Sequence, residues 1–371
     1  MSPATPKSVD RILLSIVLSL VGVGFFIFSS ASLGLLARGN VSFSSVAFTQ
    51  IILGIGGGLV AMFIVSRIHY RNWRRFAFYI FLFGVIVSLL VFVPGIGWEH
   101  GGARRWIEIG GFSFQPAEIL KIAFVIYVAT WFSRYRGKVT DFWQNIAPFL
   151  VSVGVVGIIM LLQKDTDTFL IMVAAGATMY FVQTGRWKDL LVLGIAAVLL
   201  VASLALVHDY IRMRIMSFIN PSLDPQGISY QVNQSLIAVG SGGITGRGFG
   251  QSIQKFEYLP EPIGDSIFAV YSEEFGFIGA CVLILLFSGF AFRCYKLAAK
   301  APDDFGMLVV VGLVTMLILQ TFLHVAAMVQ LAPMLGLPLP FISHGGTAML
   351  VTLASVGIIL NVSKYQKNRV T

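Results

Sequence analysis

Residues 12–36 read ILLSIVLSLVGVGFFIFSSASLGLL, and this stretch contains no charged side chain. An α-helix needs about 20 apolar residues to cross the roughly 30 Å hydrocarbon core of a bilayer, so the stretch predicts a membrane-spanning helix. It is too long for the apolar region of a cleavable signal peptide, and no small-residue cleavage site follows it. We therefore expect it to act as an anchor.

The composition of the whole chain also indicates a membrane protein. Hydrophobic residues make up 57% of the 371 residues and charged residues 12%. These values exclude a soluble enzyme, a disordered chain and a nucleic-acid-binding module, which all need more charge. They also exclude a disulfide scaffold, because the two cysteines, Cys281 and Cys294, lie in one apolar stretch, roughly 20 Å apart along a helix.

Further apolar stretches predict about ten transmembrane helices in a single all-α polytopic membrane domain over residues 1–371. They lie near residues 12–36, 45–66, 75–94, 116–133, 146–162, 168–184, 189–207, 266–292, 306–332 and 344–363. Lys164, Asp165 and Asp167 interrupt the apolar sequence between the fifth and sixth stretches. We interpret this break as a tight turn between two helices.

The basic residues predict the orientation of these helices. Seventeen of the 26 lysines and arginines fall on one side, eight fall on the other, and Lys121 lies within a span. Cytoplasmic loops carry an excess of Lys and Arg, so the first side is predicted to be the cytoplasm, with both termini there. The outer segments are then 95–115, 163–168, 333–343 and a large extracytoplasmic loop, 208–265.

Asp265 occupies the N-terminal edge of the predicted eighth span, directly after a loop that contains Glu261. Asp is a preferred N-cap residue of helices, which gives a structural interpretation. The functional interpretation is a general base, because partial burial at the membrane boundary raises the pKa of a carboxyl group to a useful value. The position alone leaves both interpretations open.

Charged residues within the predicted spans need an explanation, because charge in a membrane is costly and usually faces the protein interior. Glu118 and Lys121 lie at i and i+3 in the fourth span and can pair, either for structure or in a polar pocket. Glu273 and Glu274 lie two turns into the eighth span. For them we expect interhelical hydrogen bonds, with at least one carboxyl group protonated.

The outer segments contain two further candidates. Arg104 and Arg105 are adjacent arginines that belong either to a solvated loop or to an anion-binding loop for a phosphate-bearing headgroup. The glycine-rich segment 240–250 lacks the Gly-Lys-Ser/Thr of a nucleotide loop. It predicts a flexible or tightly turned backbone that approaches a ligand or re-enters the membrane surface. No dedicated metal site is visible, and His344 is expected to form hydrogen bonds.

Several motifs occur in a common order between residues about 100 and 350. They are Arg105-Trp106 with Phe114-Gln115-Pro116-Ala117-Glu118 and Lys121; Gln163-Lys164-Asp165 with Thr168; Tyr230-Gln231 with Gln234-Ser235-Leu236-Ile237-Ala238-Val239-Gly240-Ser241-Gly242-Gly243 and Gly246 to Gly250; Tyr258-Leu259-Pro260-Glu261 with Asp265; and Gly336 with Pro338-Leu339-Pro340-Phe341-Ile342-Ser343 and Gly345-Gly346. On these motifs the chain resembles the SEDS family of peptidoglycan polymerases, which have ten spans. Gly250-Gln251-Ser252 is more similar to the division branch of that family, FtsW, than to the elongation branch, RodA.

The resemblance implies a glycosyltransferase that polymerises lipid II on the outer face of the bacterial cytoplasmic membrane and releases undecaprenyl diphosphate. Asp265 matches the essential aspartate of the family, with the implied role of general base toward the 4-hydroxyl group of the acceptor sugar. The implied substrate-binding residues are Arg104, Arg105, Glu118, Lys121, Asp165, Gln234, Ser241, Glu261 and Ser343.

The resemblance also implies a cofactor and partners. A divalent cation, Mg or Mn, would neutralise the leaving group. A class B penicillin-binding protein, which is a single-span transpeptidase, would pack beside the chain, together with other membrane proteins of the divisome or elongasome. No nucleic acid is expected as a partner.

The chain departs from the family pattern near these motifs. Ile263-Gly264 stands where His-Thr is usual, and Asp167 stands where glycine is usual. His344 replaces the usual Tyr, and His324 the usual Asn. These changes surround Asp265 without replacing it, so we expect them to affect fine specificity more than activity.

Two other functions remain to be compared with an enzyme. A transporter that flips lipid II needs a polar path with ionisable residues near the membrane midplane. Here the ionisable residues of the spans concentrate in the outer half, which favours an enzyme. A non-catalytic scaffold for a transpeptidase would not need the carboxylate of Asp265.

Overall fold

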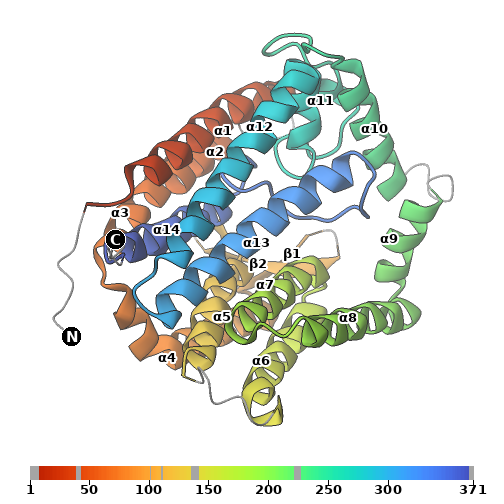
Figure 1. Cartoon of the computed structure of the whole chain (residues 1–371). Helices are drawn as coiled ribbons and strands as arrows, with labels where there is room; N and C mark the ends of the chain where they lie inside the picture. The colour runs from red at the N-terminus through yellow and green to blue at the C-terminus, as the bar shows by residue number, and fades with distance from the viewer. Residues whose placement is uncertain are drawn as a thin grey trace.

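A computed structural model shows the protein as a bundle of long helices with one small sheet (Figure 1). The structure describes residues 8–38, 43–100, 102–109, 112–134, 142–220 and 227–366. The helical elements are α1 (Arg11–Arg38), α2 (Phe43–Phe48), the π-helix η1 (Thr49–Gly57), α3 (Gly58–Arg67), α4 (Tyr70–Leu89), the 3-10 helix η2 (Leu90–Phe92), α5 (Pro116–Phe132), α6 (Phe142–Leu162), α7 (Thr166–Thr184), α8 (Trp187–Val207), α9 (Asp209–Ile219), α10 (Ile228–Ser241), α11 (Gln254–Glu257), α12 (Ile267–Ala299), α13 (Asp304–Met328) and α14 (Gly346–Ser363).

Seven helical stretches in the described residues are long and apolar enough to cross a membrane. They are 11–36, 45–67, 70–92, 187–207, 267–299, 304–328 and 346–363. The three other predicted spans coincide with α5, α6 and α7. The protein is therefore a polytopic helical membrane protein, as predicted, whereas the number of ten spans stays a prediction.

The predicted turn between the fifth and sixth spans is confirmed. α6 ends at Leu162 and α7 begins at Thr166. Between them, Lys164 has a positive φ of 57°. The amides of Lys164 and Asp165 donate back to the carbonyl oxygens of Leu161 and Met160, at 3.0 and 2.8 Å. The two helices are therefore separate elements joined by three residues.

The outer segment 95–115, predicted as a loop in an all-α fold, contains a small sheet. Strands β1 (Gly97–His100), β2 (Ala103–Ile109) and β3 (Phe112–Phe114) pair antiparallel in the order β1-β2-β3. Trp98 lies opposite Trp106 in the register of β1 and β2. The strands are short and contain charged residues, a composition that is more typical of loops, and the sequence analysis missed them for this reason.

The helices differ strongly in burial. Within the most apolar 18-residue window, 67% of the residues of α13 and 78% of those of α14 are buried inside the protein. The corresponding window of α8 has no buried residue, and α8 lies at the edge of the bundle (Figure 1). α13 and α14 therefore form the interior of the bundle, and α8 presents its apolar side chains to lipid.

The helix α12 is broken at Gly276, whose φ of 64° and ψ of −165° are open only to glycine. The glycine-rich segment 240–250 packs against this break. The Arg247 amide donates to the carbonyl oxygen of Glu273 at 3.0 Å, and the Phe277 amide donates to Gly243 at 2.9 Å. A bilayer offers no water to backbone groups, so these bonds stabilise the broken helix. The turned backbone was predicted correctly and contacts α12, whereas an approach to a ligand or to the membrane surface stays a prediction.

We expect Gly276→Ala to destabilise the protein by about 1–3 kcal/mol, the usual cost of a backbone conformation that L-residues avoid. A Cβ atom at this position would lie 2.3 Å from the Gly246 nitrogen and 2.6 Å from the Ile244 oxygen. The matched control is Gly289→Ala in the same helix, where a Cβ atom would meet nothing within 4 Å. Thermal unfolding in detergent measures both, and equal stability of the two variants would contradict the prediction.

A buried ion pair and two serine hydrogen bonds hold the segment after the glycines. Lys255 Nζ lies 2.7 Å from Glu274 Oε1, and neither side chain is exposed beyond 1%. Ser30 of α1 donates to the same carboxylate at 2.5 Å, and Ser252 donates to Glu273 at 2.6 Å. The predicted interhelical hydrogen bonds of the two glutamates are therefore present, whereas the protonation of either stays a prediction.

Candidate active site

A cavity of about 650 Å³ lies among elements that are far apart in the sequence. The sheet, the turn after α6, α9, the loop before α12 and the segment between α13 and α14 all contribute to its wall. Its charged and phenolic side chains are Arg105, Lys164, Tyr210, Arg214, Glu261 and Asp265. The cavity therefore combines two carboxylates with three basic groups.

Asp265 lines this cavity from the loop before α12. The N-cap residue of α12 is Ser266, so the capping interpretation of Asp265 is wrong. The loop is held by the segment before α14, because Ser343 Oγ donates to the Gly264 oxygen at 2.9 Å and the His344 amide donates to the Ile263 oxygen at 2.7 Å. The loop is thus held through the backbone of the two residues before Asp265. The carboxylate of Asp265 makes no hydrogen bond to any other described residue.

The environment of Asp265 favours the protonated carboxyl group. Burial, helped by the carboxylates of Glu261 and Asp167, raises the pKa of Asp265 to about 6. Arg214 and Arg105 act in the opposite direction but do not cancel the burial. A carboxyl group with this pKa is mostly ionised at neutral pH and can still accept a proton readily.

Two arginines converge on the same point as Asp265. A Cβ atom built on Gly336 would lie 3.6 Å from Asp265 Oδ2, 3.8 Å from Arg214 Nη2 and 3.9 Å from Arg105 Nη1. A side chain at position 336 would therefore fill space between the carboxylate and the two guanidinium groups. Because residue 336 is glycine, no side chain of its own fills this space, and a ligand can occupy it.

The turn after α6 positions Arg105. Its Nε donates to the Gln163 carbonyl oxygen at 3.3 Å, and its Nη2 donates to the Lys164 carbonyl oxygen. Asp165 caps α7 by accepting from the Thr168 amide at 3.4 Å. The predicted site residue Asp165 therefore holds the turn that orients Arg105, and it does not line the cavity itself.

Arg214 projects from α9 and pairs with the carboxylate of Asp167. The same carboxylate accepts from the Gly336 amide at 3.2 Å, and the Arg214 guanidinium lies 4.5 Å from the ring centre of Tyr210. Of these residues, Gly336 belongs to a motif quoted for the family resemblance, whereas Arg214 and Tyr210 were not predicted as site residues. The spacing of these residues in the chain gives no signal that they meet.

The predicted pair of arginines is divided between two faces of β2. Arg104 is exposed and its Nε lies 2.9 Å from Glu99 Oε2, whereas Arg105 lines the cavity. Successive side chains of a strand point to opposite faces, so only one of two adjacent arginines reaches a given site. The structure does not bring Arg104 to the cavity.

Glu118 and Lys121 form the predicted ion pair, at 2.9 Å and almost fully buried. Lys121 also lies 3.1 Å from Gln320 Oε1, and Gln320 donates to the Pro338 oxygen at 2.6 Å. This chain of contacts ends at Pro338, which lines the cavity. The pair therefore supports the cavity wall at Pro338, although neither of its side chains lines the cavity.

The remaining predicted site residues have separate positions. Glu261 lines the cavity, and Ser343 supports the loop of Asp265. Ser241 donates to Ala238 of its own helix, and neither it nor Gln234 lines the cavity. Gln50, a buried residue of the π-helix, was missed; it accepts from the Gly345 amide at 3.0 Å and so holds the segment before α14.

Two of the departures from the family pattern are histidines near the cavity. His344 lines it, and burial lowers the pKa of His344 to about 4. The ring of His344 stacks on Phe28, with 5.9 Å between the ring centres. His324 Nδ1 lies 2.7 Å from the Leu337 oxygen. His324 therefore holds the segment after α13, which contributes to the cavity wall, and His344 packs against α1.

The fold and the site define a polytopic helical membrane protein with a partly buried carboxylate and two guanidinium groups around one cavity. The chain belongs to the FtsW, RodA and SpoVE family of cell cycle proteins, whose profile matches residues 11–368.

Individual relatives match over most of their length. Stage V sporulation protein E of Bacillus subtilis is 37% identical over 97% of this chain and 98% of its own. A probable peptidoglycan glycosyltransferase FtsW of Geobacter sulfurreducens is 39% identical over 85% of this chain and 84% of its own.

Solved structures agree with the fold. A chain of a peptidoglycan synthase complex, studied for the coordination of polymerization and crosslinking, superimposes with a TM-score of 0.78 at 25% identity, over 97% of this chain and 99% of that chain. The rod shape determining protein RodA of Thermus thermophilus has a TM-score of 0.70 at 26% identity, over 97% and 98%.

Proposed function

We propose that the protein is a peptidoglycan glycosyltransferase that polymerises lipid II into glycan strands, for division as in FtsW or for elongation as in RodA. The observation that carries this proposal is the carboxylate of Asp265, which lines a cavity without a hydrogen-bond partner among the described residues. Arg105 and Arg214 line the same cavity, close to the same point beside Gly336. The names of the relatives support the same activity.

In this proposal the steps of the reaction belong to separate groups. Asp265 accepts the proton of the acceptor 4-hydroxyl group, and the oxygen then attacks the anomeric carbon of the lipid-linked donor chain. The bond from that carbon to the diphosphate breaks, and undecaprenyl diphosphate leaves with the electron pair. Arg105 and Arg214 donate hydrogen bonds to the diphosphate, because guanidinium groups match phosphate oxygens in shape and charge.

A divalent cation fits this cavity only together with the substrate. No described group of three or more His, Cys, Asp or Glu side chains could hold a metal ion. Mg²⁺ is commonly bound by one or two carboxylates and by substrate phosphates, and Glu261 lines the cavity. Glu261 would hold Mg or Mn beside the diphosphate, where the cation would neutralise the charge of the leaving group.

The proposal also covers the side of the membrane on which the reaction takes place and the protein partner of the chain. The cavity lies in segments that the positive-inside rule assigns to the outer face of the bacterial cytoplasmic membrane, with both termini in the cytoplasm. A class B penicillin-binding protein would crosslink the strands made here. The structural relative from a complex that couples polymerization with crosslinking supports such a partner.

The test is polymerisation of labelled lipid II by the purified chain with Mn or Mg, with and without a cognate transpeptidase. Glycan strands from the wild type support the proposal. If no strands form even with the partner present, the polymerase function is wrong. Movement of lipid II between leaflets under those conditions would then indicate a transporter.

The pH dependence gives a second prediction. Because burial raises the pKa of Asp265 to about 6, kcat/KM should rise through this pH as the base ionises, and level off above pH 7. Glu261→Gln should move the rise to lower pH, since the Glu261 carboxylate raises the pKa of Asp265. Initial rates between pH 5 and 8 measure this. A flat profile for the wild type would argue against Asp265 as the base.

A further inference from the structure

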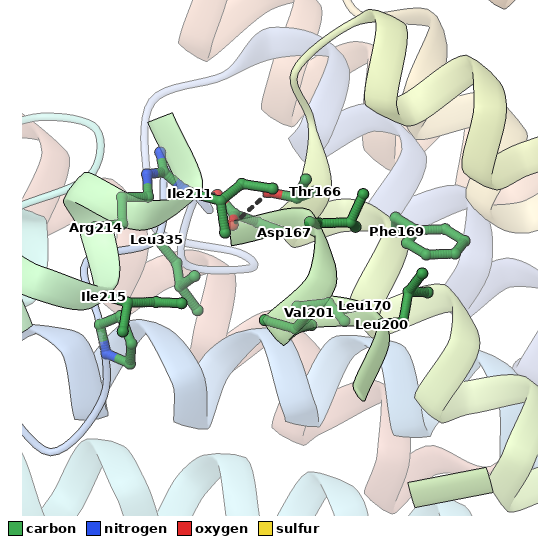
Figure 2. Close-up of a pocket in the computed structure, with 12 residues that line it drawn as sticks. Thr166, Asp167, Phe169, Leu170, Leu200, Val201, Ile211, Arg214, Ile215 and Leu335 are labelled. Carbon is green, nitrogen blue, oxygen red and sulfur yellow. Dashed lines mark hydrogen bonds and ion pairs between the residues drawn. The ribbon is translucent and has the colours of Figure 1, made fainter. Parts of the chain in front are cut away.

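The ion pair between Asp167 and Arg214 separates two spaces of different character. One is the cavity that contains Asp265, and Arg214 lines it. The other is an apolar groove of about 100 Å³ formed by α7, α8, α9 and the segment after α13, and both members of the pair line it. Figure 2 shows Asp167 and Arg214 beside apolar side chains of α7 and α8, among them Phe169 and Leu200. The pair therefore stands at the boundary between a polar and an apolar space.

The carboxylate of Asp167 is surrounded by hydrogen-bond donors of the kinds that bind an oxyanion. Arg214 Nη1 contacts its Oδ2, the Gly336 amide donates to the same oxygen at 3.2 Å, and Thr166 Oγ1 lies 3.4 Å from Oδ1. Its side chain is only 3% exposed. Guanidinium, amide and hydroxyl groups are also the donors that proteins use for phosphate oxygens.

We propose that Asp167 is an internal competitor for Arg214, which occupies the phosphate position of this arginine until a prenyl-linked diphosphate displaces it. The inference rests on the proposed function, because it takes the diphosphate as part of the substrate. Asp167 is a positioning residue: it acts through Arg214 and makes no bond to the reacting atoms. When the pair opens, the diphosphate contacts Arg105 and Arg214 while the prenyl chain lies in the apolar groove beside α8.

The two spaces explain why a lipid-linked diphosphate fits better than a free one. A free diphosphate gains only the contacts of the cavity. A prenyl diphosphate also buries apolar surface against residues such as Leu200 and Val201, which line the groove from α8. Since α8 has no buried residue, it can shift with little loss of packing and so admit the chain.

The test compares Asp167→Asn and Asp167→Gly with wild type in the full chain. Both variants remove the competing charge, and Asn keeps an oxygen that can accept from the Gly336 amide. Binding of inorganic diphosphate and of farnesyl diphosphate to the purified protein is measured, together with KM and kcat for lipid II. We expect both probes to bind roughly tenfold more tightly, since a like charge beside the anion is removed. KM should fall while kcat does not rise.

The matched control is Asp209→Asn. Asp209 also pairs with an arginine of α9, Arg212, at 2.8 Å, but its side chain is 83% exposed. This variant should bind both probes as the wild type does. Thermal unfolding of all variants shows whether they fold. If Asp167→Gly does not fold, the binding comparison rests on Asp167→Asn.

Unchanged or weaker binding of both probes by a folded Asp167→Asn would overturn the inference and leave the pair a structural support. A gain for inorganic diphosphate but none for farnesyl diphosphate would overturn the role of the groove. If the variants bind more tightly while the wild type makes no glycan with its partner, the inference holds and the polymerase function fails. If the wild type polymerises and binding is unchanged, the inference alone fails.

Discussion

Asp265→Asn is expected to lower the kcat of polymerisation by about 10²–10⁴-fold, the usual contribution of a general base. The amide has the shape of the carboxyl group but cannot accept the proton of the 4-hydroxyl group. Substrate binding should change little, because Arg105 and Arg214 remain. Single-turnover polymerisation of labelled lipid II measures the effect.

The same variant should unfold at a higher temperature at pH 7. The pKa of Asp265 is about 6 in the folded protein and near 3.8 without the fold, so ionisation is disfavoured by folding. This penalty is absent below the lower pKa and complete above the higher one, and Asn removes it. Stability of the variant and wild type should therefore converge as the pH falls towards 4.

The control for both effects is Glu99→Gln, which neutralises an exposed carboxylate of the outer sheet. It should leave activity and stability almost unchanged, because exposed ion pairs contribute about 0–1 kcal/mol. Normal polymerisation by Asp265→Asn would move the base to Glu261, the other carboxylate of the cavity. Loss of activity together with lower stability would instead indicate a damaged fold.

The membrane fold could be predicted from the sequence because long apolar stretches have few alternatives. The break of α12 could not be predicted from the sequence. Gly276 stands between two phenylalanines in an apolar run, and glycine is frequent in unbroken transmembrane helices. Its left-handed conformation becomes evident only when the segment 240–250 is seen to pair with the exposed backbone.

The candidate site was also predictable in part. Asp265 was found because its motif carries the family resemblance and because a carboxylate that is partly buried at the membrane boundary can act as a general base. Arg214 was not found, since its guanidinium comes from a helix in the large outer segment and lines the cavity of Asp265 only in the folded protein. The side chains of β2 alternate between its two faces, which separates Arg104 from Arg105. This separation was not predicted, because the segment was interpreted as a loop.

The second large effect is expected at the ion pair of Lys255 and Glu274. Lys255→Met should destabilise the protein by about 3–5 kcal/mol, because it leaves the buried Glu274 carboxyl group without its cationic partner. The loss should appear as a lower unfolding temperature in detergent. Lys255 also donates to the Gly250 oxygen at 2.9 Å, so the glycine-rich segment should loosen as well.

A double-mutant cycle separates the charge from the packing. In the double variant Lys255→Met, Glu274→Met no charge is left without a partner, so most of the stability should return, as it does when buried pairs become apolar. A double variant as unstable as the sum of the single variants would show that the two side chains act independently. Activity of the double variant is informative too. Glu274 lies in the short first part of α12, which begins directly after Asp265, so restored stability with low kcat would show that the pair fixes the position of the base.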